Sequence, residues 1–554
     1  MSDETVGSAP SPVRVLLSGE PFAGAARRLA AELASDTVAS RLAEGDPSVW
    51  PHVVWPATGW AGLARASRPL AGQLAALRER FVVGGAHRVL LVGTPDAVAA
   101  ARLLAGSPAT AGPVRLTALD SADPVQVAEA LSGELEETVL VVADPAGDDP
   151  VVGAVHRAVR TVLADEVGPD TLATRTVHVT EPGSALDTPA ADGITVITSD
   201  AGVPGRFGAL GPLGLVPAGL AGADVAGILA TAGEASGTLA ADDPDNPALL
   251  LAGALVAARG SVLALRDAER APGLTGWLAP LLTAAGLVAA PAGAEAGRAG
   301  DGTDPAAPAG GPVDGPGTAA LGGPPAVVEV HAAGTGPVPE FGGGAVRTSA
   351  DPGATVVLWQ AAAALAARAL ETDPFAPAPP VADPASAAES PSFVDGGVAV
   401  HAAGDWLPAG VTSVAGALDA LAGAAGPGGH LAVSAWLDPE SDASIAVLSG
   451  PLAARAGMPV AFGWAPGCRS GDTGGPDRAA HCHLTGGSSG ADVDTDPVPP
   501  GAGNAPEPSG LDNLHAAQAR AVVADQRRRG RPVLRLHLTD RVSGLVTLAR
   551  AVQG

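Results

Sequence analysis

The residue best suited to ligand chemistry is an arginine that follows a predicted strand. Residues 194–198 are rich in β-branched side chains and predict a strand, and Arg206 follows the turn at its carboxyl end, next to Gly205. Ligands of parallel α/β sheets bind outside the carboxyl ends of the strands, where a guanidinium can pair with an oxyanion and a glycine lets the backbone approach it. The sequence therefore predicts an anion-binding role for Arg206. The alternative is that Arg206 pairs with one of the many carboxylates nearby.

An acidic loop is the second candidate. It follows a predicted strand at residues 138–143 and contains Asp144, Asp148 and Asp149. Carboxylate oxygens are hard ligands that could collect a cation, but carboxylates also cap the N-termini of helices. We favour the capping interpretation and predict neither a metal nor another cofactor.

Three further patterns carry less information. His481 and His483 alternate around Cys482 as on one face of a strand, which suits a metal site, but no second ligand pair accompanies them, so a structural pair is favoured. Residues 486–490 fit the pattern G-x-S-x-G without its strand-to-helix context and are interpreted as linker. The basic run at 527–531 indicates a helix end favoured by the helix dipole, and the alternative is an anion or partner site.

Composition excludes several classes of function. The 554 residues contain no lysine and no tyrosine, so neither can serve in catalysis. The formal net charge of −26 gives a surface that repels nucleic acid and anionic membranes. The acidic start lacks the basic and apolar regions of a secretion signal, and the most apolar windows, such as 247–258, are shorter than a membrane span. We therefore expect a cytoplasmic protein with no nucleic-acid or membrane partner.

Alternating strand and helix patterns predict an α/β fold. Residues 1–12 are expected to be disordered and 13–80 helical, with Trp50, Trp55 and Trp60 anchoring the connection. Short, nearly continuous apolar strands between helices predict a buried parallel sheet in a first domain at 81–230. Residues 231–289 are interpreted as a helical connection, 290–326 as a flexible linker rich in Ala, Gly and Pro, and 327–554 as a second α/β domain with flexible inserts near 376–392 and 485–510.

Several stretches of the chain resemble one enzyme family. The matching residues are Asp200, Gly205, Arg206, Ala209, Leu210, 214–217 and 221–224; Asp120, Ser121, Asp123 and Pro124; Thr180 and 182–184; and Gln518, 529–531 and 533–538. They resemble, in register, the motifs of the phosphoglucose isomerase (glucose-6-phosphate isomerase) family, in particular its long actinobacterial-type members. The resemblance implies two sugar-isomerase (SIS) three-layer α/β domains with parallel sheets. It also implies a sugar phosphate as ligand and a tendency to form homodimers.

The same resemblance shows what this chain lacks in its phosphate-binding loops. Gly93 is the glycine that remains of the family's first loop, and Gly147 stands among carboxylates where the family has serines and a lysine. A carboxylate about 5 Å from a phosphate charge opposes binding by roughly 3 kcal/mol at an effective dielectric constant of ~20. With Gly205 and Arg206, these two glycines are the substrate-binding residues that the resemblance implies.

The residues that perform the family's chemistry are also missing. The position of the catalytic base is Ala284, and residues 468–475, which correspond to a family segment with His and Lys, contain neither. Arg206 is the one residue that keeps its implied catalytic-site position.

Two functions follow. The leading hypothesis is a degenerate phosphoglucose-isomerase-like protein of sugar-phosphate metabolism that acts in binding or scaffolding, by docking onto a protein partner. The alternative is an active glucose-6-phosphate isomerase, which interconverts glucose 6-phosphate and fructose 6-phosphate, with acids or bases recruited from elsewhere. His430, Asp472 and His515 are the first candidates for that role.

Overall fold

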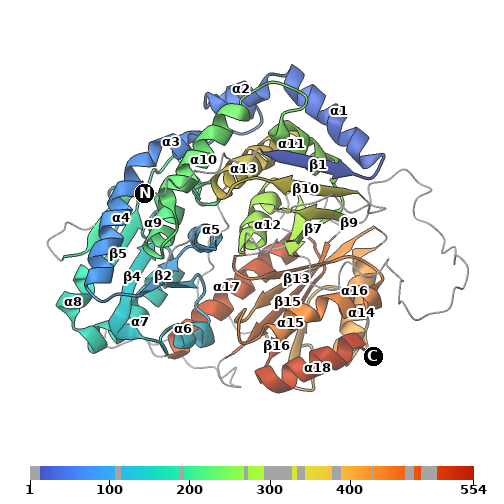
Figure 1. Ribbon diagram of the computed structural model, residues 1–554. Helices are drawn as coiled ribbons and strands as arrows, with labels where there is room; N and C mark the ends of the chain where they lie inside the picture. Colours follow the sequence, from blue (N-terminus) through green and yellow to red (C-terminus); the bar gives the residue numbers. More distant parts are fainter. Residues whose placement is uncertain are drawn as a thin grey trace, which may run out of the picture.

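The computed structural model describes residues 13–106, 114–187, 193–266, 272–291, 327–332, 344–376, 389–426, 428–467, 479–487 and 508–553. The start predicted to be disordered lies outside these residues, as do 292–326 of the predicted linker and most of the inserts predicted near 376–392 and 485–510. Within the described residues the chain forms three sheets, each with helices packed against it (Figure 1). The predicted class, α/β with parallel sheets, is confirmed.

The first sheet is parallel throughout and matches the prediction for the first domain. Its order is β3-β2-β4-β5-β6, and we call it the five-stranded parallel sheet. β2 and β4 are buried along their whole length because alternate residues face two cores: Leu91 and Val141 one, Leu90 and Val142 the other. The elements of this region are α4 (Arg68–Val83), β2 (Arg88–Gly93), α5 (Pro95–Ala105), β3 (Arg115–Leu119), α6 (Pro124–Ala130), β4 (Thr138–Ala143), α7 (Pro150–Val167), α8 (Pro169–Thr174), β5 (Thr176–Thr180), β6 (Thr195–Thr198), η5 (Gly205–Phe207) and α9 (Pro212–Leu220).

A second sheet shares a hydrophobic core with the first. Its order is β1-β10-β9-β7-β8, with β1 antiparallel and the other strands parallel, and we call it the mixed sheet. Its elements are β1 (Arg14–Ser18), β7 (Val262–Arg266), β8 (Val288–Pro291), β9 (Val327–His331) and β10 (Ala345–Ser349). The helices around it are α1 (Phe22–Ser35), α2 (Val38–Ala43), α3 (Leu63–Ala66), α10 (Val225–Thr238), α11 (Pro247–Ala257), α12 (Leu274–Ala284) and α13 (Pro352–Ala369).

Segments 13–80 and 231–289 are mainly helical, but they also supply strands that the sequence analysis did not predict: β1, β7 and the first half of β8. These strands were missed because short apolar runs such as VLALR and VAAP have no periodicity that separates a strand from a buried helix. Strands β9 and β10, which the sequence placed in the second domain, also pair within this sheet.

The third sheet has its own core and contains the predicted C-terminal strands. Its order is β11-β12-β16-β15-β13-β14; the last four strands are parallel, and β12 and β11 add antiparallel pairs at one edge. We call it the six-stranded sheet. Its elements are β11 (Phe393–Asp395), β12 (Val398–Ala402), α14 (Val414–Ala425), β13 (His430–Trp436), α15 (Ser444–Val447), α16 (Ser449–Ala456), β14 (Val460–Trp464), β15 (Ala479–Gly486), α17 (Pro508–Arg528), β16 (Val533–Leu538) and α18 (Arg541–Gln553).

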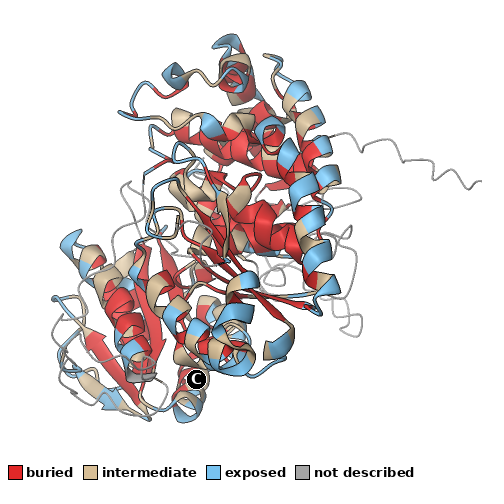
Figure 2. Cartoon of the chain, turned by 90° about the vertical axis from the view of Figure 1, so that its left-hand side faces the viewer, coloured by how far each residue is buried: buried red, intermediate tan, exposed pale blue. Residues whose placement is uncertain are grey.

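Helix α13 is a core helix. It is the one helix in the described chain that is long and apolar enough to cross a membrane, but 83% of its most apolar window is buried inside the protein. Leu358, Trp359 and Leu365 are fully buried in the core of the mixed sheet. Figure 2 shows how buried strands and helix faces fill the interior, while exposed residues lie on the outer faces of the helices.

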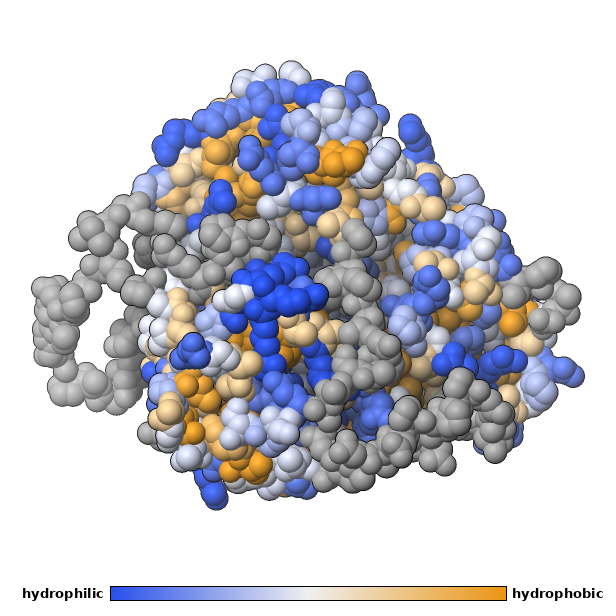
Figure 3. All heavy atoms as spheres, turned by 180° about the vertical axis from the view of Figure 1, so that it is seen from behind, coloured by the Kyte–Doolittle hydropathy of each residue, from blue (hydrophilic) through white to orange (hydrophobic). Residues whose placement is uncertain are grey.

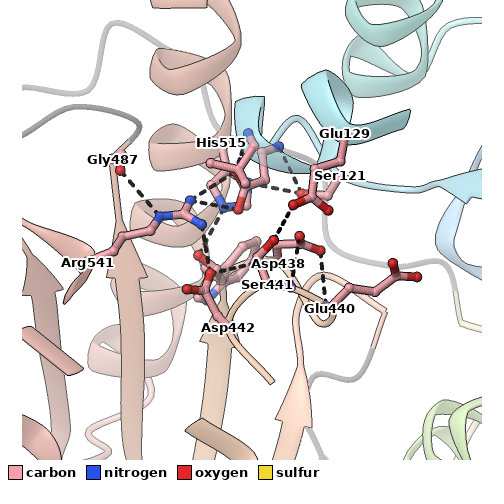
Figure 4. Close-up of polar contacts among 12 residues, drawn as sticks. Ser121, Glu129, Asp438, Glu440, Ser441, Asp442, Gly487, His515 and Arg541 are labelled. Carbon is pink, nitrogen blue, oxygen red and sulfur yellow. Dashed lines mark hydrogen bonds and ion pairs between the residues drawn. The ribbon is translucent and has the colours of Figure 1, made fainter. Parts of the chain in front are cut away.

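Helix α17 and a buried polar network join the five-stranded parallel sheet to the six-stranded sheet. Leu511 and Leu514 of α17 pack into the core beneath α6 and α7. Arg541 Nη2 donates to both carboxylate oxygens of Asp123 at 2.9 Å, and Arg541 Nη1 donates to Asp442 Oδ2 at 2.7 Å. Figure 4 shows the network, in which a hydrogen bond from Ser441 to Glu129 adds a second link between the two regions.

Candidate functional site

A large cleft opens at the carboxyl ends of the five-stranded parallel sheet. Its volume is 2610 Å³, and it is lined by the loops after β2, β3, β4, β5 and β6, by the ends of α12 and α13, and by α17. The sheet reverses its strand order at β2, with β3 on one side and β4 on the other, and the crevice at such a reversal is where open α/β sheets bind ligands. The structure thus brings together Gly93, Gly205, Arg206 and Ala284, all of which line this cleft.

Arg206 is held at the cleft wall by the residue that follows it. Phe207 is fully buried, its ring packs 4.8 Å from that of Trp60, and its carbonyl accepts a hydrogen bond of 2.9 Å from Gln360. These contacts fix the short turn η5, so that the half-buried Arg206 is presented to the cleft. Within the part of the chain that the structure describes, the Arg206 side chain makes no hydrogen bond or ion pair. The predicted alternative, pairing with a nearby carboxylate, therefore does not occur among these residues.

The glycines of the candidate site make room for protein atoms. A Cβ at Gly205 would lie 2.8 Å from Asp96 Oδ2, and a Cβ at Gly93 would lie 3.1 Å from the Ala143 carbonyl oxygen. Gly147 has a φ of +72°, and a Cβ there would lie 3.0 Å from the Ser184 side chain. Gly147 itself does not line the cleft, although both its neighbours do. The glycines thus allow the three loops to pack closely around the cleft.

The acidic loop after β4 caps a helix, as the sequence predicted. Asp149 Oδ1 accepts from the backbone N–H groups of Val151 and Val152 at 2.8 and 3.1 Å, at the start of α7. Asp144 is 3% exposed and accepts from Asp149 N at 3.0 Å. Burial raises the pKa of Asp144, and the charges of Asp148 and Asp149 raise it further. The described residues contain no group of three or more His, Cys, Asp or Glu side chains arranged to hold a metal ion.

The cleft as a whole is acidic. Among its described lining residues are ten carboxylates and six arginines. Arg527 pairs with Glu389 at 2.8 Å, and Arg528 and Arg529 share Asp525 at 3.2 and 2.8 Å, so each of these three arginines has a carboxylate partner. Arg206 and Arg259 have no ion-pair partner among the described residues, and Arg259 is exposed. Among the described residues, these two guanidinium groups are therefore candidates for binding an anion in the cleft.

Ala284 lies at the end of α12 in an apolar and hydroxyl-lined part of the cleft, with Pro280 and Thr283. The segment after α13 packs against it, because Thr372 Oγ1 donates to the Ala285 carbonyl at 2.9 Å. This contact brings the segment that contains Glu371 and Asp373 close to Ala284, and both carboxylates line the cleft. Glu371 has a φ of +56°, a conformation that side-chain-bearing residues rarely adopt.

The two histidines that the sequence suggested as recruited bases, His430 and His515, do not lie in the cleft. His515 Nε2 donates to the Trp436 carbonyl at 3.2 Å and its Nδ1 accepts from Ser121 Oγ at 3.2 Å, so both ring nitrogens are used in the interface between the sheets. Burial lowers the pKa of His515, and it lowers that of His430 to about 4. Neither residue lines the cleft. Asp472 and the rest of 468–475 lie outside the described residues.

The predicted structural histidine pair is buried in β15. His483 Nδ1 accepts from Trp436 Nε1 at 3.1 Å, and its Nε2 bonds Gln526 Oε1 at 2.8 Å. His481 is 1% exposed. Burial lowers the pKa of His481 well below its ordinary value, which keeps it neutral.

Sequence reasoning missed two residues of the cleft. Trp55, expected to anchor the N-terminal connection, is 87% exposed at the cleft, whereas Trp50 and Trp60 are buried and do anchor it. Glu371 was missed because a Glu after a helix carries no signal that its backbone is left-handed. For Trp55, the Pro residue that follows it was the one available sign that the segment leaves regular structure.

Comparisons with known proteins agree with this architecture. No family model matches the chain. Over 204 residues the chain is 31% identical to a protein of Haloarcula marismortui named a probable glucose-6-phosphate isomerase. The match covers 36% of this chain and 46% of that protein, so the chain spans less than half the length of this relative.

A solved structure from a bacterium is similar in fold. A hypothetical protein of Thermus thermophilus superposes with a TM-score of 0.51 and 20% identity, over 66% of this chain and 96% of that one. A glucose-6-phosphate isomerase of Chlamydia trachomatis superposes less well, with a TM-score of 0.45 and 16% identity over 64% of this chain and 82% of that one. Part of the chain is therefore similar in sequence to a probable glucose-6-phosphate isomerase, and its α/β fold is similar to that of the Thermus thermophilus protein.

Proposed function

We propose that this protein binds a sugar phosphate in the cleft, with Arg206 pairing with the phosphate, and that it has lost the isomerase reaction. Its role is then binding or scaffolding in sugar-phosphate metabolism, with a protein partner. The observation that carries the proposal is the guanidinium of Arg206, which has no ion-pair partner among the described residues and is held at the cleft wall by the buried Phe207. A charge-assisted pair between arginine and a phosphate is among the strong hydrogen-bonded interactions in proteins.

Loss of catalysis is supported by the residues around Ala284. Aldose–ketose isomerisation needs a base that moves a proton between two adjacent carbons. Ala284 has no such group, and no histidine is among the described residues that line the cleft. The sequence also lacks lysine, which excludes that residue as the cation that stabilises the enediolate.

The alternative function is an active glucose-6-phosphate isomerase. One observation favours it: Glu371 lies beside Ala284 in a left-handed backbone conformation, and strained residues gather at functional sites. In that case Glu371 takes the role of the base, and turnover disappears in Glu371→Gln.

Two measurements on purified protein test these functions. Thermal unfolding is followed with and without glucose 6-phosphate for the natural protein, for Arg206→Ala and for Arg455→Ala, a control in α16 outside the cleft. We expect the ligand to raise the melting temperature of the natural protein and the control but not of Arg206→Ala, since binding to the folded state stabilises it. A coupled assay converting fructose 6-phosphate to glucose 6-phosphate is run on the same proteins. No ligand response by the natural protein would refute binding, and turnover that depends on Arg206 would refute the loss of catalysis.

A further inference from the structure

Trp55 is exposed to an extent that its residue type does not explain. All eight tryptophans lie in the described residues; five are at most 5% exposed, whereas Trp55 is 87% exposed and its neighbour Val54 is 80% exposed. Tryptophan carries a large apolar surface, so leaving it in water forgoes much of the stabilisation that burial gives. On the face seen in Figure 3, hydrophobic side chains lie in several separate groups within a mainly hydrophilic surface.

The exposed position is built into the structure, because the segment around Trp55 is fixed on both sides. Before it, the Trp50 ring packs 4.9 Å from Phe375, and Trp50 Nε1 donates to the Ala364 carbonyl at 2.9 Å. His52 Nε2 bonds the Thr372 carbonyl at 2.8 Å. After it, the Trp60 ring lies 4.8 Å from that of Phe207. The segment is thus anchored on the protein core while the Trp55 ring stays outside it.

The segment that follows Trp55 meets the Arg206 loop. A Cβ at Gly59 would lie 3.4 Å from Val203 Cγ2, so Gly59 lies against the turn that leads to Arg206. Trp60 packs on Phe207, the residue after Arg206. Trp55, Gly59, Val203 and Arg206 all line the cleft. An exposed aromatic ring and an unpaired guanidinium therefore belong to adjoining loops of one wall.

We propose that Trp55 stacks on the ring of the sugar whose phosphate pairs with Arg206. This inference rests on the proposed function and adds what recognises the sugar itself. One face of a pyranose ring presents mainly C–H groups, which pack well on an aromatic face, and ligand sites combine such apolar walls with a few placed polar groups. An uncharged ring also gives this acidic cleft a surface that does not repel an anionic ligand.

Titration calorimetry with glucose 6-phosphate and with inorganic phosphate separates the two contacts. We expect Trp55→Ala to weaken binding of glucose 6-phosphate about tenfold, the size of a good aromatic contact, and to leave binding of inorganic phosphate unchanged. Trp55→Phe keeps an aromatic ring and should retain most of the affinity. Val83→Ala, which changes a side chain that is 82% exposed outside the cleft, is the matched control and should bind both ligands normally.

The outcomes distinguish this inference from the proposed function. If Trp55→Ala binds glucose 6-phosphate normally while Arg206→Ala does not, stacking is refuted and the proposed function stands. If the natural protein does not bind glucose 6-phosphate, both are refuted. Equal losses of affinity for both ligands, or a change of oligomeric state in Trp55→Ala measured by light scattering, would also overturn stacking. The second result would assign Trp55 to an interface between two copies of the chain.

Discussion

Removing Arg541 should destabilise the protein more than removing any exposed arginine. The Arg541 side chain is 13% exposed, and its two partners Asp123 and Asp442 are 1% and 6% exposed. Replacing it by methionine keeps much of its volume but leaves two buried carboxylates without their cation. Breaking a buried ion pair by removing one partner costs about 3–5 kcal/mol, a large part of the ~5–15 kcal/mol that stabilises a typical domain.

The pH dependence of this loss follows from Asp442. Burial raises the pKa of Asp442 above its ordinary 3.8, and Arg541 opposes that rise, so the pKa is higher still in Arg541→Met. The folded state then binds a proton more readily than the unfolded state. Stability is therefore lost as the pH rises through the interval from 3.8 to the folded pKa. In Arg541→Met this interval reaches to higher pH, so the deficit should be largest at neutral pH and shrink as the pH falls towards 4.

Urea denaturation followed by circular dichroism at pH 7 and pH 5 measures this effect. Asp123→Asn is a second variant to measure, because asparagine can still accept the hydrogen bond from Val125 N that caps α6 but carries no charge. The double variant Arg541→Met with Asp442→Asn should recover part of the loss, since it no longer buries an unpaired charge at Asp442. A deficit below about 1 kcal/mol at pH 7, the size of an exposed pair, or an equal deficit at both pH values, would refute the reasoning.

Two further predictions concern single residues. Glu371→Gly should stabilise the protein by about 0.5–1 kcal/mol, because a left-handed L-residue costs about 1–2 kcal/mol and the greater flexibility of glycine in the unfolded chain cancels part of that gain. Glu371→Ala keeps the strain and is the control in a urea titration. Equal stability of the two variants would count against the strain. His430→Gln should make the free energy of unfolding fall less steeply as the pH is lowered. Burial lowers the pKa of His430 from 6.5 to about 4. The stability due to neutral His430 is therefore present above pH 6.5 and is lost as the pH falls towards 4. Melting temperatures between pH 7 and pH 4 test this, and parallel curves for the two proteins would show that another group dominates.

The sequence predicted one sheet well and another not at all, for physical reasons. In β2 and β4 every residue is buried, and runs such as RVLLVG and TVLVVA are long and rich in β-branched and leucine side chains, which distinguishes them from helices. β8 has the short sequence VAAP. β1 has the sequence RVLLS, lies near the N-terminus and pairs with β10, which is distant in the sequence. Pairing between segments so far apart in the sequence leaves no local pattern, so the mixed sheet could not be predicted.

The residues of the candidate site likewise fall into a group that the sequence predicted and a group that it did not. Gly93, Gly205 and Arg206 were predicted to lie together because they follow strands of one parallel sheet, and the carboxyl ends of such strands meet at one edge. Trp55 and Glu371 belong to the cleft through packing between distant segments, such as the contact of His52 with Thr372. Exposure and backbone conformation at these residues depend on that packing and have no local sequence signature.

The acidic loop opposes an anion less than its sequence indicates. Each ionised carboxylate about 5 Å from a phosphate charge costs roughly 3 kcal/mol at a dielectric constant of ~20, so three aspartates in the loop after β4 argue strongly against a phosphate there. In the structure, burial raises the pKa of Asp144, while Asp149 accepts from the N–H groups at the start of α7, whose dipole offsets part of its charge. The dipole of α7 therefore reduces the repulsion that this loop exerts on a bound anion below the value that a count of its carboxylates predicts.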